Sequence, residues 1–246
     1  MKRYPILVLA YRRVDELQAT LDALEQLNPS IVYFHIHDAP NEEHQKKVNS
    51  VKKLISLYDK PKEVKYSKEP LGVRTSLYSA LEWISLKEEV FFVFEDDIVL
   101  KPKSLSSIQK LMDRLEKEDG LVKFGEHREH SVYWGWATTS KTAKIIIKDS
   151  ILEIDEEIAI PHFQNKLHYK AVMELYRRQM TLAWDDEFGF ICKILGVNVI
   201  LSKETLTTHI GVFSTRINNG LDTTFGKNTH VTFRNGVLVP QENDNA

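Results

Sequence analysis

The segment Glu89-Val90-Phe91-Phe92-Val93-Phe94 is followed directly by three carboxylates, Glu95-Asp96-Asp97, termed here the acidic triplet. Five of the six residues in the first segment are apolar, and such a run is typical of a strand buried on both faces of a sheet. Adjacent carboxylates repel one another and are costly in a half-buried place unless a cation or hydrogen bonds compensate them. The pattern predicts a central strand with a metal site at its end; the alternative is a solvated acidic strand end.

Strand and helix patterns alternate along the rest of the chain. An apolar run over residues 6–10 predicts the first strand, leucines at helical spacing over residues 15–27 predict a helix, and residues 31–36 predict the second strand. The further elements predicted are helices over 48–57, 76–86, 105–115, 169–180 and 185–195, and strands over 63–66, 121–124 and 197–201. This order predicts an α/β fold with a mostly parallel central sheet flanked by helices, whose ligands bind outside the carboxyl ends of the strands.

Length and composition indicate a globular enzyme. The chain has 246 residues, 42% of them hydrophobic and 28% charged, and no Pro/Gly/Ser-rich linker divides it, so we expect a single α/β domain over residues 1–246. The formal net charge of −2 leaves no basic surplus for binding nucleic acid. The apolar run at residues 6–10 is too short for a signal peptide or a membrane span, and we expect a cytoplasmic enzyme without a transmembrane segment. The single cysteine, Cys192, lies in an apolar stretch and is predicted to be buried.

A second acidic cluster, Trp184-Asp185-Asp186-Glu187-Phe188, lies at the start of a predicted helix. One carboxylate here is a candidate general base, a group that takes the proton from an attacking hydroxyl. The alternative is a set of helix N-terminal acids that complement the helix dipole. Taken alone, the cluster does not distinguish the two.

Three further residues are candidate ligand contacts. Arg74 follows the turn Pro70-Leu71-Gly72 at a helix start, where it and backbone N–H groups suit a diphosphate; the alternative is a tight turn with a solvated arginine. Asp38 follows the second strand and suits the uracil or ribose of a nucleotide; the alternative is a helix cap or Asx-turn. His209 precedes a stretch rich in Gly, Asn and Thr and is a candidate phosphate or metal contact, or a structural residue. None of the nine histidines forms a zinc-type motif.

Together, these segments resemble the GT-A glycosyltransferases, and within them the N-acetylglucosaminyltransferase I family and its bacterial sugar-transferase relatives. The resemblance spans most of the chain, and its markers are residues 5–13, the acidic triplet, Gly135-Trp136, Trp184-Asp185-Asp186 and Thr208-His209-Ile210-Gly211. It implies a GT-A, Rossmann-like fold in which residues 1–125 mainly bind the nucleotide sugar and residues 126–246 mainly form the acceptor side and a flexible loop. The implied activity is transfer of GlcNAc or a similar hexose from a UDP-sugar to a glycan, lipid-linked or other hydroxyl acceptor, as in polysaccharide or glycan synthesis.

The resemblance also implies roles for single residues. Asp97 binds Mn²⁺ (or Mg²⁺), while Glu95 and Asp96 contact the ribose and the sugar. The acid after the tryptophan, Asp185, is the catalytic base, with Asp186 as the second choice. The other implied donor contacts are Arg12, Asp38, Arg74, Ser214 and Arg216. The loop that holds the last two resembles one that closes over the bound donor and excludes water.

The sequence departs from the eukaryotic members of this family at residues 72–81, which contain no histidine for the donor. Arg74 resembles the residue that replaces this donor-binding histidine in the bacterial relatives. Two alternative functions remain. A sugar-1-phosphate nucleotidyltransferase uses a Gly-rich loop after the first strand, where this chain has Tyr11-Arg12-Arg13-Val14. A catalytically silent carbohydrate-binding module would stack sugars on Tyr133, Trp134 and Trp136.

Overall fold

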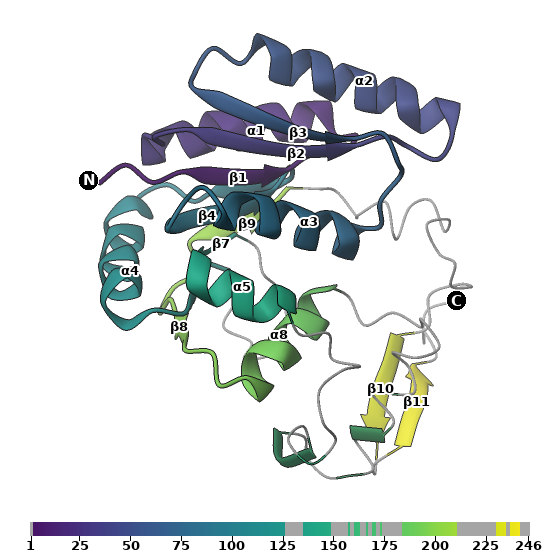
Figure 1. Ribbon diagram of the computed structural model, residues 1–246, viewed down its shortest axis with the longest axis vertical. Helices are drawn as coiled ribbons and strands as arrows, with labels where there is room; N and C mark the ends of the chain where they lie inside the picture. Colours follow the sequence, from purple (N-terminus) through teal and green to yellow (C-terminus); the bar gives the residue numbers. More distant parts are fainter. Residues whose placement is uncertain are drawn as a thin grey trace.

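The computed structural model of the chain is shown in Figure 1. It describes residues 2–125, 135–148, 184–210, 230–234 and 237–241, together with residues 157, 160–162, 166, 169, 170 and 173. For residues 162, 184–187, 190, 230–234 and 237–241 it describes the backbone alone.

A seven-stranded sheet with the strand order β3-β2-β1-β4-β7-β6-β8 forms the centre of the molecule. Its strands are, in chain order, β1 (Ile6–Leu9), β2 (Val32–His37), β3 (Lys62–Ser67), β4 (Val90–Glu95), β6 (Leu121–Lys123), β7 (Trp136–Thr139) and β8 (Val199–Leu201). Strands β3, β2, β1 and β4 run parallel, as do β6 and β8, whereas β7 is antiparallel to both of its neighbours. The predicted α/β fold with a mostly parallel central sheet is confirmed.

Helices cover both faces of this sheet, because successive side chains of a strand point to opposite faces. On one face, Ile6 and Val8 share a buried cluster with residues of α1 (Val14–Leu24), α2 (Glu42–Leu57) and α4 (Leu105–Glu118). On the other face, Leu7 belongs to a cluster with α3 (Val73–Ser85), α5 (Ser140–Lys148) and α8 (Trp184–Ile194). Figure 1 shows α1 and α2 on one side of the sheet and α3, α5 and α8 on the other. Two 3-10 turns are η1 (Glu25–Leu27) and η2 (Ile160–His162).

Two short antiparallel pairs lie outside the large sheet. Strand β5 (Ile98–Leu100) pairs with β9 (Thr207–His209), and β10 (His230–Arg234) pairs with β11 (Val237–Gln241). Strand β5 begins directly after the acidic triplet, so its pairing brings the segment around residue 209 to the end of β4. The same contact is extended by the backbone N–H of Ile210, which donates to the carbonyl of Asp97 at 2.8 Å.

Gly135 allows β7 to approach β4 closely. Its φ of 74° lies in the left-handed region. A Cβ at this position would come within 2.6 Å of Cε1 of Phe94, the residue that precedes the acidic triplet. Both the backbone conformation and the lack of space therefore require a glycine at position 135. This is the physical reason for the glycine in the Gly135-Trp136 segment.

The elements found differ from those predicted in a few places. Helix α2 begins six residues earlier than the predicted helix over 48–57, and α3 begins three residues earlier than the predicted helix over 76–86. Strand β6 is one residue shorter than the predicted strand over 121–124. Strands β5, β7, β9, β10 and β11 and helix α5 were not predicted. The helix predicted over 169–180 and the loop after residue 210 lie largely outside the described residues.

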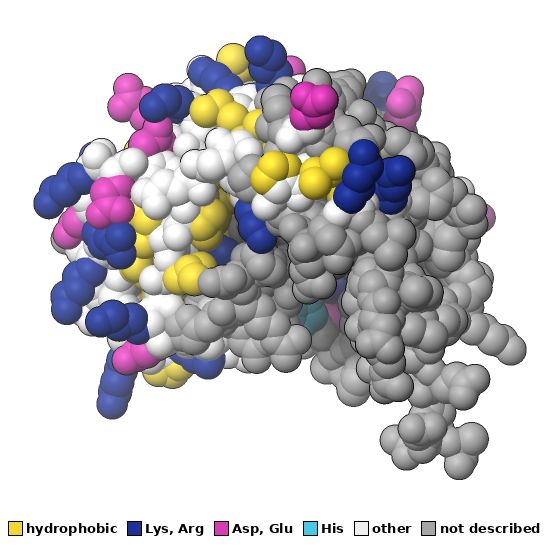
Figure 2. All heavy atoms as spheres, turned by 90° about the horizontal axis from the view of Figure 1, so that it is seen from below, with side chains coloured by type: hydrophobic (Ala, Val, Ile, Leu, Met, Phe, Trp, Pro, Cys, Tyr) yellow, Lys and Arg dark blue, Asp and Glu magenta, His cyan; other side chains and the backbone are white. Residues whose placement is uncertain are grey.

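The described surface and core agree with the composition. Cys192, the single cysteine, is buried, as predicted. Figure 2 shows that, on the face seen from below, the described part carries basic and acidic side chains interspersed. Within the described ranges, no helix is both long enough and apolar enough to cross a membrane.

Candidate active site at the carboxyl ends of β1 and β4

The acidic triplet lies where two neighbouring parallel strands end. In the register of the sheet, Leu9 of β1 stands opposite Glu95 of β4, and the backbone N–H of Asp96 donates to the carbonyl of Leu9 at 3.0 Å. The residues that follow β1 therefore meet the residues that follow β4. Because parallel strands end at the same edge, this is the place at which α/β sheets bind ligands.

Asp96 is held by three neighbours and is 4% exposed. Its Oδ2 accepts from the backbone N–H of Tyr11 at 2.9 Å, and its Oδ1 accepts from Nη1 of Arg13 at 3.0 Å. The hydroxyl of Thr20, on α1, donates to its carbonyl at 3.0 Å. Burial raises the pKa of Asp96 to about 6, although the Arg13 guanidinium opposes that rise. Its carboxylate is thus fixed in position.

Asp97 is fully buried. Its Oδ2 accepts from Nη1 of Arg13 and lies 3.1 Å from Nε2 of His209. Among the residues that the structure describes, no hydrogen-bond donor contacts its Oδ1. A buried carboxylate oxygen without a hydrogen-bond partner is costly. Oδ1 of Asp97 therefore has an unsatisfied interaction that a further ligand would satisfy.

Glu95 and His209 have pKa values shifted by this cluster. Burial, and then the charges of Asp97 and Asp96, raise the pKa of Glu95 to about 8. The hydrogen bond to Asp97 is the largest cause of a raised pKa for His209, and burial opposes it. Glu95 therefore takes up a proton more readily than an exposed glutamate does, and the contact with Asp97 favours the charged form of His209.

The residues present fit a divalent metal ion, although they do not form a complete site. The described parts of the chain contain no group of three or more His, Cys, Asp or Glu side chains arranged to hold a metal. However, Mg²⁺ and similar ions are usually held by one or two carboxylates plus substrate phosphates and water. Oδ1 of Asp97, which no donor contacts among the described residues, suits that mode of binding, and His209 lies beside the other oxygen of the same carboxylate.

Two predicted nucleotide contacts, Arg12 and Asp38, lie near the ends of β1 and β2. Arg12 is 7% exposed, its Nη1 lies 2.7 Å from Nδ1 of His44, and its guanidinium lies 5.3 Å from the centre of the Tyr11 ring. The Tyr11 ring in turn stacks on that of His37, with centroids 4.5 Å apart. Arg12 is therefore anchored against the Tyr11 ring and contacts His44, near the start of α2.

Asp38 is already hydrogen-bonded within the protein. Its Oδ1 accepts from Nε2 of Gln45 at 2.6 Å and from Nζ of Lys52 at 3.0 Å. A hydrogen bond from Tyr66 is the largest cause of its lowered pKa, with Lys52 and Gln45 adding to it. These contacts hold the carboxylate ionised and oriented at the end of β2.

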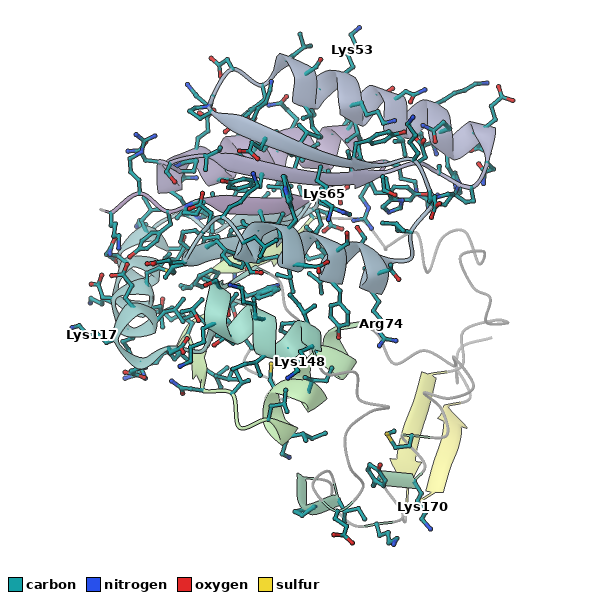
Figure 3. All side chains as sticks on the ribbon, viewed as in Figure 1. Lys53, Lys65, Arg74, Lys117, Lys148 and Lys170 are labelled. Atoms are coloured by element: carbon teal, nitrogen blue, oxygen red, sulfur yellow. The ribbon has the colours of Figure 1, made fainter. Side chains whose placement is uncertain are left out.

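Arg74 lies in the first turn of α3, and its guanidinium carbon is 5.6 Å from the centre of the Tyr78 ring. Figure 3 shows its side chain extending from α3 away from the central sheet. The structure thus places Arg74 at the same end of the sheet as the triplet but on the side of α5 and α8.

Several predicted residues cannot be placed. Asp185 and Asp186 lie in the first turn of α8, but their side chains are outside the described set. Ser214, Arg216, Tyr133 and Trp134 also lie outside it. Trp136 is described: it is 1% exposed and its ring centroid lies 5.0 Å from that of Phe188. It is a core residue, which removes it from the sugar-stacking surface of the alternative binding module.

Sequence reasoning missed Arg13 and Tyr11 as members of the site. Both belong to residues 5–13, one of the segments that resemble the glycosyltransferases. Of the two adjacent arginines, however, the resemblance implies a role for Arg12 alone. The only available signal was that two arginines follow the first strand. Which of them reaches the triplet depends on how the chain turns into α1.

No family model matches the sequence, and no curated protein matches it. Similar solved structures include a 4-diphosphocytidyl-2C-methyl-D-erythritol synthase from Anaerococcus prevotii, with 11% identity, 81% of this chain and 88% of that chain covered and a TM-score of 0.48. A putative glucose-1-phosphate thymidylyltransferase from Bacillus anthracis has 11% identity, coverages of 85% and 90% and a TM-score of 0.47. HddC from Yersinia pseudotuberculosis has 12% identity, coverages of 62% and 84% and a TM-score of 0.40. Similarities of this size assign no activity to the chain.

Proposed function

We propose that this protein is a metal-dependent inverting glycosyltransferase that moves a sugar from a UDP-sugar to an acceptor hydroxyl. The observation that carries the proposal is the state of Asp97. It is a fully buried carboxylate at the end of the central strand, it has His209 at 3.1 Å, and among described residues its Oδ1 has no partner. Such a group suits a cation that also binds a diphosphate.

Asp97 and His209 would hold the metal, Mn²⁺ or Mg²⁺. When bound, the ion stabilises the negative charge that develops on the leaving diphosphate. Asp96, fixed by the Tyr11 N–H and by Arg13, is positioned to accept from a sugar or ribose hydroxyl, and Glu95 lies beside it. A carboxylate that the protein already orients binds a hydroxyl with little further loss of entropy.

The nucleotide is proposed to lie over the ends of β1 and β2. Arg12 and the stacked rings of Tyr11 and His37 form a flat, partly cationic surface there, which suits a uracil base. Asp38, oriented by Lys52 and Gln45, would accept from the base or ribose. Arg74, Ser214 and Arg216 are proposed as further donor contacts. In this proposal one domain spans residues 1–246, with residues 1–125 mainly binding the donor and residues 126–246 mainly binding the acceptor.

Asp185 is proposed as the general base, with Asp186 as the second choice. Asp185 lies in the first turn of α8, and Phe188 and Ile191 of the same helix are buried. In Figure 1, α8 begins on the side of the sheet at which β1 and β4 end. The base takes the proton of the acceptor hydroxyl as its oxygen bonds to the anomeric carbon, and the bond to the diphosphate breaks on the opposite face.

Calorimetry with UDP, in the presence and absence of Mn²⁺, tests the proposal. UDP binding that depends on Mn²⁺ is the expected result. Equal UDP affinity with and without Mn²⁺ would contradict the proposed metal site. A screen of UDP-sugars for Mn²⁺-dependent hydrolysis then identifies the donor. Pyrophosphate release from UTP and a sugar 1-phosphate would indicate a nucleotidyltransferase instead.

A further inference from the structure

Arg13 occupies the space beside the acidic triplet that a cation would take. It lies between β1 and α1, with an extended backbone, and its side chain is 19% exposed. A single nitrogen, Nη1, contacts both Oδ1 of Asp96, at 3.0 Å, and Oδ2 of Asp97. One cationic group therefore bridges the two buried carboxylates.

This bridge answers a need that the triplet creates. Asp96 and Asp97 are 4% and 0% exposed, and two neighbouring buried carboxylates without a cation are strongly unfavourable. A guanidinium keeps its proton at any pH at which proteins are folded, whereas His209 is charged only when protonated. Among the described residues at this site, Arg13 is thus the partner of Asp96 and Asp97 whose positive charge does not depend on pH.

We infer that Arg13 is a resident counter-cation that a divalent metal has to displace from Asp97. This inference rests on the metal site proposed above. A metal held by Asp97 comes within a few ångströms of Nη1 of Arg13, because both cations interact with the same carboxylate. Two positive charges at that separation in a buried site repel one another, so the guanidinium has to leave Asp97 for the metal to bind well.

The displaced side chain has an evident new partner. A planar guanidinium matches the oxygens of a phosphate group, and in the proposed reaction the metal brings a diphosphate to this edge of the sheet. The donor would therefore compensate Arg13 for the contact that it loses. Metal and nucleotide would then strengthen each other's binding, since each removes part of the cost of binding the other.

The experiment compares Mn²⁺ binding by the full chain and by Arg13→Met, measured by calorimetry without nucleotide, together with the melting temperature of the metal-free protein. We expect Arg13→Met to bind Mn²⁺ about tenfold or more tightly, because a positive charge has been removed beside the metal. We expect its metal-free form to melt at a lower temperature, because the buried carboxylates have lost a partner. A purely structural Arg13 would lower the melting temperature without tightening Mn²⁺ binding.

Three further variants serve as controls. Arg114→Met makes the same charge change on the exposed Arg114–Glu118 pair of α4 and should leave Mn²⁺ affinity unchanged. Arg13→Lys keeps the charge and should keep the wild-type affinity. Arg13→Gln removes the charge but retains a hydrogen-bond donor, so it gives the same test if Arg13→Met does not fold.

The outcomes separate this inference from the proposed function. Tighter Mn²⁺ binding by Arg13→Met or Arg13→Gln, but not by Arg114→Met, supports the inference. Equal or weaker binding by these Arg13 variants overturns it and leaves the metal site standing. Absence of Mn²⁺ binding by every protein, with UDP present as well as without it, overturns both.

Discussion

Nε2 of His209 lies 3.1 Å from Oδ2 of Asp97, although the two residues are far apart in the sequence. The antiparallel pairing of β5 with β9 produces this contact, because Ile98 stands opposite His209 in its register. The hydrogen bond from the N–H of Ile210 to the carbonyl of Asp97 extends the pairing. The two residues expected to bind a metal are thus held together by backbone pairing, whatever occupies the site.

The first prediction concerns Asp97. Asp97→Asn removes one negative charge beside a divalent ion. Two unit charges about 4 Å apart at an effective dielectric constant of about 20 interact by about 4 kcal/mol, and the double charge of the ion increases this, so affinity should fall by at least roughly a thousandfold. We expect Mn²⁺ binding and metal-dependent turnover to be lost, as measured by calorimetry and by sugar transfer. The control is Asp113→Asn, on the exposed face of α4. Retention of wild-type Mn²⁺ affinity by Asp97→Asn would exclude Asp97 as the ligand.

The second prediction concerns Asp185. Asp185→Asn should leave Mn²⁺-dependent UDP binding largely intact while lowering sugar transfer by about 10²–10⁴-fold, the usual contribution of a general base. Asp186→Asn makes the same change one position along α8 and tests the second choice. Loss of transfer by Asp186→Asn but not by Asp185→Asn would assign the base to Asp186. Transfer at the wild-type rate by Asp185→Asn would show that the base is another residue.

The third prediction concerns stability far from the active site. Asp119 joins α4 to β6, and its carboxylate accepts from the N–H of Gly120 at 2.8 Å, from Oγ1 of Thr142 at 3.1 Å, from Thr139 and from Nζ of Lys141 at 2.8 Å. Its positive φ of 57° is a backbone conformation that is unfavourable for residues other than glycine, and these hydrogen bonds offset that cost. Asp119→Ala should lower the free energy of unfolding by about 1–3 kcal/mol, because buried donors lose their acceptor. Urea unfolding measures this, with Asp113→Ala as the control; equal stability of the two variants would contradict it.

The fourth prediction concerns the pH dependence of that contribution. Burial alone would raise the pKa of Asp119, but hydrogen bonds from Lys141 and Thr139 outweigh it and lower the pKa from 3.8 to about 2. A carboxyl whose pKa is lower in the folded state stabilises the protein above its unfolded pKa, and this stabilisation is lost as the pH falls through the folded value. The difference in unfolding free energy between wild type and Asp119→Asn should therefore be constant above about pH 5 and shrink between about pH 4 and pH 2. A difference in unfolding free energy that grows as the pH falls from about 4 to about 2 would contradict a lowered pKa of Asp119 in the folded state.

Much of the fold could be predicted from local patterns. The apolar runs that became β1, β2 and β4 and the helical spacing of leucines in α1 depend only on neighbouring residues, and each was predicted at nearly its observed bounds. Strands β5, β7 and β9 could not be predicted in this way. Their residues become strands because of partners distant in the sequence, such as Val90 opposite Thr139 and Ile98 opposite His209.

The candidate site divides along the same line. The sequence by itself determined that three carboxylates end a buried strand, because apolar runs and like charges act over a few residues. Only the tertiary structure decided that Arg13, rather than Arg12, contacts Asp96 and Asp97, and that His209 lies beside Asp97. These contacts depend on the neighbouring ends of β1 and β4 and on the register of β5 with β9, which are set by long-range packing and backbone pairing.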